Sequence, residues 1–348
     1  MSGRSVLAPL SQAFVAFTIE ADNEFESRMP HRTAADRGDG SKSGPWLTSL
    51  TFWSNYLRQI PDDGCTAREL ARRAGDGASA IASRLGELTR WRYARVAPGE
   101  GDQGERLVTL TAAGRQARET WAPLEALVEE RWSERFGADT ISRLRAALSS
   151  LPVGDGLPLG FPILAWDRAR DRRPADPIVE GGLSTLLARA LLAMAIDFDA
   201  RSPLSLATTQ LVLPHVTDPT PVRELPLLAG VSKEAIAIIV GRLARSGLAT
   251  VPASPKVLTL TRRGVAAAHE AESQRDELDA KWSALSELPD VLAEIVTPTL
   301  AEGLEPKPNG WRARAPYLTQ TRATLADPSA ALPRFPMVSH RGGYPDGS

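Results

Sequence analysis

The feature that most constrains this chain is a repeat between two stretches, residues 65–114 and 220–264. Shared residues lie 155 positions apart before a glycine-rich insert in the first stretch and 150 positions apart after it, so the second copy is five residues shorter. One structural unit therefore occurs twice, and two similar units in one chain are expected to pack about a pseudo-twofold axis. The matching residues of the first copy are Arg68, Glu69, Leu70, Ala74, Gly75, Gly86, Leu88, Arg90, Leu110, Thr111 and Gly114.

The order of local signals in the first copy predicts a helix, a turn, a second helix and a hairpin. Thr66 and Glu69 have the spacing of a capping box, so a helix begins there. Residues 75–77, Gly-Asp-Gly, predict the turn, and apolar residues at helical spacing predict the second helix over 78–91. Strands over 93–96 and 107–110 enclose the glycine-rich insert as a wing. This order is that of a winged helix-turn-helix unit.

The predicted fold is mainly α with small β-hairpin wings. Two winged helix-turn-helix domains are joined by a helical, dimerisation-like region with pseudo-twofold symmetry. The halves are expected at 1–151 (winged helix 46–114) and 178–301 (winged helix 204–264), with a linker at 152–177 and an irregular, proline- and glycine-rich tail at 302–348. The remaining helices are predicted at 9–26, 46–59, 111–136, 139–150, 186–198, 204–214, about 265–288 and 290–301.

Composition limits the function classes. A formal net charge of −1 argues against a strong sequence-independent grip on phosphates, but it leaves room for a local basic face. The single cysteine, Cys65, permits no intrachain disulfide and favours a reducing compartment. The most apolar run, 183–196, is too short to span a bilayer. We therefore expect a cytoplasmic protein without a membrane partner.

The pattern resembles the MarR family of bacterial transcription regulators. The resemblance rests on the helix-turn-helix with its wing and on the strand-to-helix junction VTLTAAGRQ at 108–116. It implies a DNA-binding protein whose effector pocket lies between the helical region and a winged unit, here as a single-chain version of the usual homodimer. The family's Asp-x-Arg wing element is incomplete, because Asp102 is followed by Gly104, with Arg106 nearby. The second wing is reduced to PASPK, and Ile238 stands where the first copy has Ser83.

The candidate DNA-binding residues lie on the second helix and wing of each unit. In the first unit, Ser79, Ser83, Glu87 and Arg90 fall opposite the apolar Ile81, Leu85 and Leu88. Arginines near this helix could also contact phosphates; the alternative is a solvated arginine face. The full set is Ser79, Ser83, Arg84, Arg90, Arg92 and Arg106 in the first unit, and Lys233, Arg242, Arg245 and Lys256 in the second.

Aromatic and apolar residues of both halves are candidates for an effector pocket, because ligand pockets favour apolar walls between domains. The alternative is that they form hydrophobic core. These residues are Phe14, Phe17, Trp46, Phe52, Trp53, Tyr56, Met194 and Phe198.

Two further groups were weighed as functional. Glu20, Asp22, Glu24 and Glu26, with His31 nearby, could bind a metal or act as acid and base, but a solvated or interdomain face is favoured because no second histidine has ligand spacing. Cys65 could sense oxidants, although the resembled family places such cysteines in its first helix. We expect neither a metal nor another cofactor.

These observations predict a sequence-specific transcription regulator, a repressor, that responds to a small apolar or aromatic effector. Its partners are double-stranded DNA and that effector, and it is a monomer with an internal pseudo-dimer; further dimerisation is left open. The alternative is a degenerate winged-helix protein that binds a small molecule or protein partner without reading DNA. An enzyme is not expected. Tandem winged-helix DNA glycosylases, which share the architecture and carry a Gln-x-Gln or Gln-x-Asp motif, are the enzyme alternative.

Overall fold

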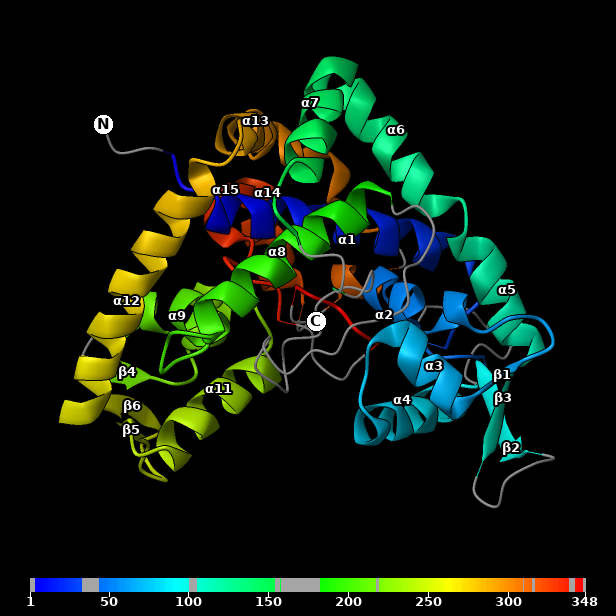
Figure 1. Ribbon diagram of the computed structural model, residues 1–348, viewed down its shortest axis with the longest axis horizontal. Coiled ribbons are helices and arrows are strands. Elements are labelled where there is room, and N and C mark those ends of the chain that lie inside the picture. Colours follow the sequence, from blue (N-terminus) through cyan, green and yellow to red (C-terminus); the bar gives the residue numbers. More distant parts are fainter. Residues whose placement is uncertain are drawn as a thin grey trace.

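The computed structural model describes residues 4–32, 44–99, 105–153, 157, 182–216, 219–308, 310–314, 317–337 and 342–346, except the side chains of Ala78 and Ser79. Within these ranges the chain is mainly helical and carries two small antiparallel sheets (Figure 1). Most of the predicted linker and the tip of the first wing, including Asp102 and Gly104, lie outside the described residues.

Each half of the chain repeats a similar order of elements. The first half contains α1 (Leu7–Arg28), α2 (Leu50–Asn55), η2 (Leu57–Gln59), β1 (Cys65–Thr66), α3 (Ala67–Ala74), α4 (Ala78–Arg90), β2 (Ala94–Pro98), β3 (Arg106–Leu110), α5 (Ala112–Trp121), α6 (Leu124–Phe136) and α7 (Ala138–Ser149). The second contains α8 (Leu183–Asp199), α9 (Leu206–Leu211), η4 (Leu213–His215), β4 (Thr220–Pro221), α10 (Leu225–Ala229), α11 (Lys233–Arg245), β5 (Ala249–Thr250), β6 (Val257–Leu260), α12 (Arg262–Ser283) and α13 (Leu288–Ile295). The remaining elements are η5 (Pro298–Gly303), η6 (Trp311–Ala313), α14 (Leu318–Ala326) and α15 (Pro328–Ala331).

The two sheets have matching strand order and register. The first is ordered β1-β3-β2 and the second β4-β6-β5. Cys65 pairs with Val108, and Thr220 pairs with Leu258, at the two offsets found in the sequence repeat. Likewise, the pairing of Ala94 with Leu110 recurs between residues 249 and 260. The sequence repeat therefore coincides with a repeat of backbone pairing.

The junction between each sheet and its following helix explains the repeated Leu-Thr and Gly residues. Thr111 and Thr261 are the N-caps of α5 and α12, and each side-chain oxygen accepts a hydrogen bond from the glycine three residues later. A Cβ on Gly114 would overlap the carbonyl oxygen of Tyr93, and a Cβ on Gly264 would overlap that of Leu248. Only glycine lets the helix start pack this closely against the preceding turn.

The helical layer joins the two halves. Helix α1 packs against α8, and α7 packs against α13. In Figure 1, α1 and α8 cross the middle of the view, while α5 with α6 and α12 form opposite flanks. Asp22 in the last third of α1 accepts a hydrogen bond from the backbone of Leu50 at the start of α2. Asp199 at the end of α8 likewise accepts one from Leu206 at the start of α9.

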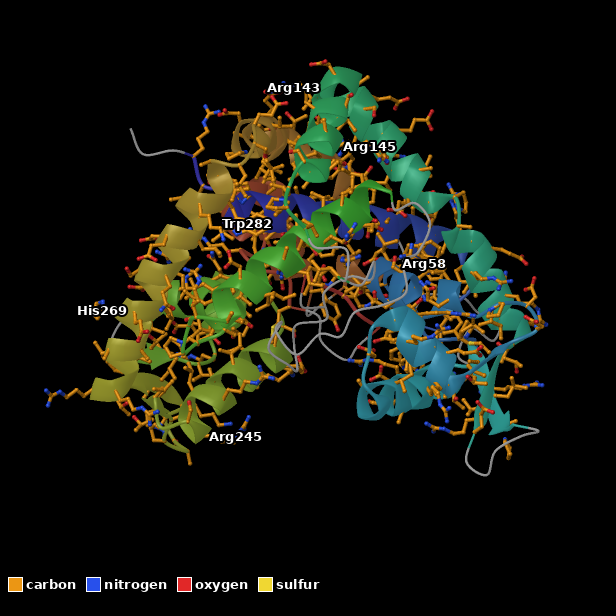
Figure 2. All side chains as sticks on the ribbon, viewed as in Figure 1. Arg58, Arg143, Arg145, Arg245, His269 and Trp282 are labelled. Atoms are coloured by element: carbon orange, nitrogen blue, oxygen red, sulfur yellow. The ribbon has the colours of Figure 1, made fainter. Side chains whose placement is uncertain are left out.

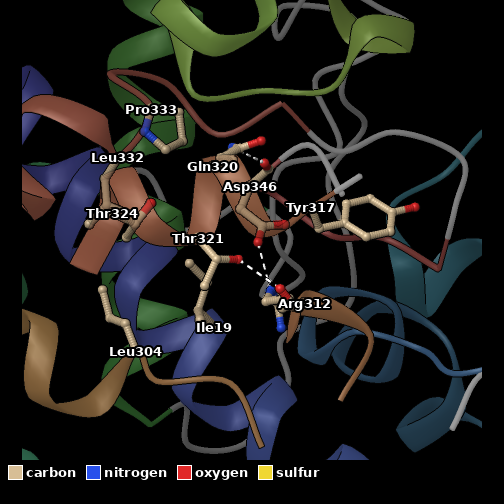
Figure 3. Close-up of a pocket in the computed structure, with 10 residues that line it drawn as sticks. All are labelled: Ile19, Leu304, Arg312, Tyr317, Gln320, Thr321, Thr324, Leu332, Pro333 and Asp346. Atoms are coloured by element: carbon tan, nitrogen blue, oxygen red, sulfur yellow. Dashed lines mark hydrogen bonds and ion pairs between the residues drawn. The ribbon is translucent and has the colours of Figure 1, made fainter. Parts of the chain in front are cut away.

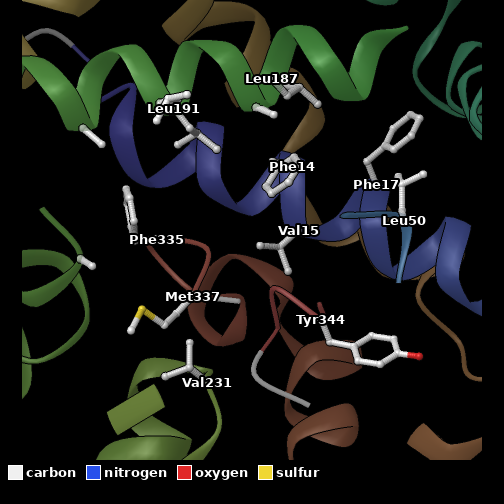
Figure 4. Packing of buried hydrophobic residues seen from close by; sticks show 14 of the residues in the cluster. Phe14, Val15, Phe17, Leu50, Leu187, Leu191, Val231, Phe335, Met337 and Tyr344 are labelled. Atoms are coloured by element: carbon white, nitrogen blue, oxygen red, sulfur yellow. The ribbon is translucent and has the colours of Figure 1, made fainter. Parts of the chain in front are cut away.

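One hydrophobic core runs through both halves and the tail (Figure 4). Phe14 of α1 and Leu191 of α8 are almost fully buried in it, as are Phe335 and Met337 of the tail. Val231, which lies just before α11, also belongs to this core. The two halves are therefore not independent globules joined by a linker.

The tail is more ordered than the sequence predicted. It forms α14 and α15 in a region expected to be irregular, and its 317–337 segment packs under α1. The hydroxyl of Ser11 donates to the carbonyl oxygen of Pro333, and the backbone N–H of Ser49 donates to that of Gly342. The side chain of Gln320 donates to the carbonyl oxygen of Gly230 in the second half. The tail therefore contacts both halves.

Several helices are shorter than predicted because prolines interrupt them. The expected helix over 111–136 divides into α5 and α6 at Pro123, which has no N–H to continue the helical hydrogen bonds. The expected helix over 290–301 divides into α13 and η5 at Pro298. No helix in the described ranges combines the length and the apolar character needed to cross a bilayer.

Candidate nucleic-acid interface

Helices α4 and α11 are the elements predicted to meet a DNA groove. Each follows a short helix that ends in a left-handed glycine, Gly75 (φ 67°) or Gly230 (φ 68°). In Figure 1 both helices lie along the lower edge of the molecule, with strands β2 and β3 at one end of that edge and β5 and β6 at the other. The capping box of Thr66 and Glu69 that was predicted for α3 is confirmed.

The polar face of α4 is only partly as predicted. Ser83 and Arg90 are exposed, whereas the side chain of Ser79 lies outside the described residues. Arg84 and Glu87 are buried instead, with exposed fractions of 8% and 7%, and their side chains form an ion pair at 3.0 Å.

The burial of Arg84 follows from its place on the helix. It lies three residues after Ile81 and one before Leu85, so it shares their inward face. Its charge had suggested a contact with DNA, but the periodicity assigns it to the core, where Glu87 compensates it. Arg84 is therefore removed from the set of exposed cations.

The other predicted cations of the first unit are exposed. Arg92 lies in the turn after α4 with a φ of 70°, and its carbonyl oxygen accepts a hydrogen bond from Thr111. Arg106 is the first residue of β3 and faces solvent. Together with Arg90, they place positive charge from the end of α4 to the base of the wing.

The second unit distributes its cations differently. Lys233, Arg245 and Lys256 are exposed, and Arg242 is half-buried. Ile238, predicted to face the groove, is half-buried and packs against the hydrophobic core. Its packing reduces the apolar surface that α11 exposes.

A cleft of about 670 Å³ opens beside the end of α11, between α9 and α12. Arg242 and Arg245 of α11 line it together with Arg263 of α12. Figure 2 labels Arg245 on α11 and His269 on α12, the two helices that bound the cleft. Arg263 is not among the residues predicted from the sequence. Comparing the two copies by size as well as by identity would have found the cleft, because Ser246 stands where the first copy has Trp91.

Seven of the eight predicted effector-binding residues are core residues. Seven of the eight are buried: Phe14, Phe17, Phe52, Trp53, Tyr56, Met194 and Phe198. Trp46 is 41% exposed, and the guanidinium of Arg32 lies over its ring at 5.0 Å from the centroid. None of the eight lines the α9–α11–α12 cleft or the narrow cavity under α1 shown in Figure 3. The core alternative accounts for the seven buried residues, because close packing among their rings takes up their surfaces.

The acidic residues of α1 are not on a solvated face. Glu20, Asp22, Glu24 and Glu26 are buried, with exposed fractions between 1% and 6%. Arg135 pairs with Glu20 at 3.1 Å, and both Arg131 and Lys307 pair with Glu24. The backbone N–H of Trp311 donates to Glu26 at 2.9 Å. These carboxylates bind α1 to α6 and to the tail.

Neither a metal centre nor a reactive thiol emerges from the described residues. They contain no group of three or more histidine, cysteine, aspartate or glutamate side chains placed to hold a metal ion. Cys65 is buried, and burial raises the pKa of its thiol, which disfavours the reactive thiolate.

A buried charge cluster connects α1 with the tail. Arg312 pairs with Asp346 at 2.9 Å and with Asp22 at 3.4 Å (Figure 3 shows the Asp346 pair). Burial raises the pKa of Asp22 to about 7, although Arg312 opposes the shift. One guanidinium faces two carboxylates here, so the folded protein favours a proton on Asp22. Local sequence patterns do not predict this cluster, because Asp22 and Arg312 are 290 residues apart.

Comparison with known protein families, with curated proteins and with solved structures finds no match to this chain.

Proposed function

We propose that this chain is an internally duplicated winged helix-turn-helix protein that binds double-stranded DNA and regulates transcription. The observation that carries the proposal is the double occurrence of one arrangement: a short helix, a left-handed glycine, a longer helix and a three-stranded sheet of equal order and register. Small units of this kind place the longer helix in the major groove and the hairpin beside the backbone. Two such units on one edge of the molecule could bind an operator that has two half-sites.

The exposed cations agree with such a contact. Arg90, Arg92 and Arg106 surround α4 and its wing, and Lys233 and Lys256 flank α11. The net charge of −1 means that affinity must come from this local surface rather than from the whole molecule. We therefore expect modest nonspecific binding and a clear dependence on operator sequence.

The contacts between the halves support a pseudo-dimer. The packing of α1 against α8 and of α7 against α13 joins equivalent elements of the two halves, as a twofold axis requires. In a symmetric dimeric reader the half-sites lie one helical turn apart, roughly 34–36 Å. Because the second wing is shorter and the two recognition helices differ, this chain would read an asymmetric operator.

The regulatory role follows the resemblance to MarR-like proteins. We propose a cytoplasmic repressor whose DNA-competent state is disfavoured when an effector binds. The second candidate is a winged-helix protein that has lost DNA recognition and retains only ligand or protein binding. The short second wing and the burial of Arg84 favour this alternative.

A duplex titration separates the two candidates. The full chain is titrated into a labelled duplex that carries the region upstream of its own gene, at about 50 mM and about 200 mM salt. The regulator requires saturable binding that weakens as salt rises, and an unrelated duplex of equal length is the control. Binding that is absent, or equal for the two duplexes, contradicts sequence-specific regulation; absent binding favours the second candidate.

A further inference from the structure

The α9–α11–α12 cleft belongs to the second unit because the equivalent space in the first unit is filled. At the repeat offset of 155, Ser246 corresponds to Trp91. Helices α2 and α9 begin 156 residues apart, at Leu50 and Leu206, so Thr208 in α9 corresponds to Phe52 in α2. In the first unit the rings of Phe52 and Trp91 are both buried and lie 4.9 Å apart between centroids. Two small hydroxyl residues stand in place of two large rings, and among the described residues no other side chain fills the space, so the cleft opens there.

The charge of the lining residues also differs between the copies. Arg242 corresponds to Glu87, and Arg263 corresponds to Ala113. Arg245 adds a third guanidinium to the lining; a Cβ on Gly241 would lie 3.1 Å from one of its terminal nitrogens, so the side chain folds back along α11. Glu270 is the only acidic residue among the lining residues that the structure describes. The lining therefore has an excess of positive charge.

The remaining lining fits an organic molecule rather than a bare ion. Leu243, Leu248 and Ala267 supply apolar surface, and Ser205 and Thr208 supply hydroxyl groups. The volume lies within the range of small-molecule pockets, about 300–1,000 Å³. Guanidinium groups bind the oxygens of phosphate and carboxylate groups through paired, charge-assisted hydrogen bonds.

The geometry points to this cleft as the binding site of a small organic dianion, an apolar body that carries a phosphate monoester or two carboxylates. The ligand's head group contacts the guanidiniums of α11 and α12, and its body lies on the leucines. One part of this inference rests on the proposed function, namely the effect on DNA binding. Arg242 and Arg245 belong to the helix that would meet DNA, so a bound dianion competes with DNA phosphates and weakens DNA binding.

Calorimetric titration of the full chain, without DNA, tests the site. The probes are phenyl phosphate, phthalate, inorganic phosphate and phenol. Phenyl phosphate or phthalate should bind at least about tenfold more tightly than phenol, which lacks the charge, and than inorganic phosphate, which lacks the body. The comparison between phenyl phosphate and phthalate distinguishes the two kinds of head group. If neither binds more tightly than both controls, the inference is overturned.

Matched variants locate the binding. Arg263→Ala should weaken the better probe by about tenfold to about a hundredfold, while Arg262→Ala, its exposed neighbour outside the lining, should leave it unchanged. Ser246→Trp places in the cleft the residue of the first copy and should abolish probe binding. Circular dichroism and thermal unfolding check that each variant folds. Equal losses in the two arginine variants, or unchanged binding in a folded Ser246→Trp protein, would place the probe elsewhere and overturn the inference.

The DNA readout is measured separately. Adding the better probe to the duplex titration should weaken binding in the unmodified chain and have no effect in Ser246→Trp. If no duplex binds, the proposed function fails while the calorimetric result still decides the site. If DNA binds and the probe leaves its affinity unchanged, the competition is refuted and the calorimetric result stands alone.

Discussion

Trp132 on α6 donates its indole N–H to the carboxylate of Glu20 on α1 at 3.1 Å. The same bond recurs between Trp282 on α12 and Asp197 on α8, also at 3.1 Å. The tryptophans are 150 positions apart, which is the second offset of the repeat, and both bonds join the long flanking helix to the first helix of its half. The two halves therefore share a polar contact as well as a backbone pattern.

Trp132→Phe should lower the free energy of unfolding by about 1–3 kcal/mol, because it removes one donor from a buried carboxylate. Trp282→Phe is the matched control. The side chain of Asp197 is 25% exposed and that of Glu20 is 4% exposed, so water replaces the lost bond more readily and the loss should be smaller. Urea denaturation measures both. A larger loss for Trp282→Phe would contradict this ranking.

Stability should fall as pH rises from about 4 towards 7 through the titration of Asp22. Its pKa is raised to about 7 in the folded protein, whereas an unfolded aspartate releases its proton near pH 4. The folded state therefore binds more protons in this window, and the free energy of unfolding decreases with pH until Asp22 is ionised in both states. Urea unfolding at pH 5 and pH 7 checks this. In the control variant Asp22→Asn, the free energy of unfolding should depend less on pH over this range. Parallel pH profiles for the two proteins would refute the assignment.

Arg84 and Arg90 should separate stability from DNA binding. Arg90→Ala removes an exposed cation and should reduce the salt dependence of duplex binding by about one unit of slope, with little effect on folding. Arg84→Ala leaves Glu87 buried without its partner, so the free energy of unfolding should fall by on the order of 3 kcal/mol. Salt-dependent titrations and urea denaturation are run on both variants. An unchanged stability for Arg84→Ala would mean that the ion pair contributes little.

Gly230→Ala should be more damaging than Gly247→Ala. Both glycines have a positive φ, 68° and 71°, so each alanine carries a backbone cost of about 1–2 kcal/mol. A Cβ at Gly230 would also overlap the carbonyl oxygen of Ala331 in the tail, whereas nothing lies within 4 Å of a Cβ at Gly247. We expect a further loss of about 1–3 kcal/mol for Gly230→Ala. Denaturation midpoints compare the two variants. Equal losses of stability would show that the tail moves away from the new Cβ without a loss of free energy.

Local signals predicted the repeated units well. The helix expected at 78–91 is found at Ala78–Arg90, and the capping box of Thr66 and Glu69 forms. These features depend on residues within a few positions of one another, so a single stretch of sequence contains the information. The strand pairing was predictable for the same reason, because a short insert joins β2 to β3.

The features that the sequence analysis missed depend on distant partners. The spacing of Arg84 from Ile81 predicts a buried side chain, whereas its charge predicts an exposed one. The prediction of a DNA contact followed the charge. The carboxylates of α1 resemble a solvated face until their partners from α6 and the tail are known. The candidate binding cleft exists because a small side chain, Ser246, stands where the first copy has the large Trp91. Only a comparison of side-chain size between the two copies predicts it.

The acidic residues of α1 determine the order in which parts of this protein can pack during synthesis. Asp22, Glu24 and Glu26 find partners in Arg312, Lys307 and the backbone of Trp311, which lie 283 to 290 residues later. Chains emerge from the ribosome at about 5–20 residues per second, so these contacts with the tail form only many seconds after α1 has emerged. During that interval their burial would be costly, and α1 is expected to stay loosely docked. The first half is therefore expected to complete its packing only after the tail has been translated.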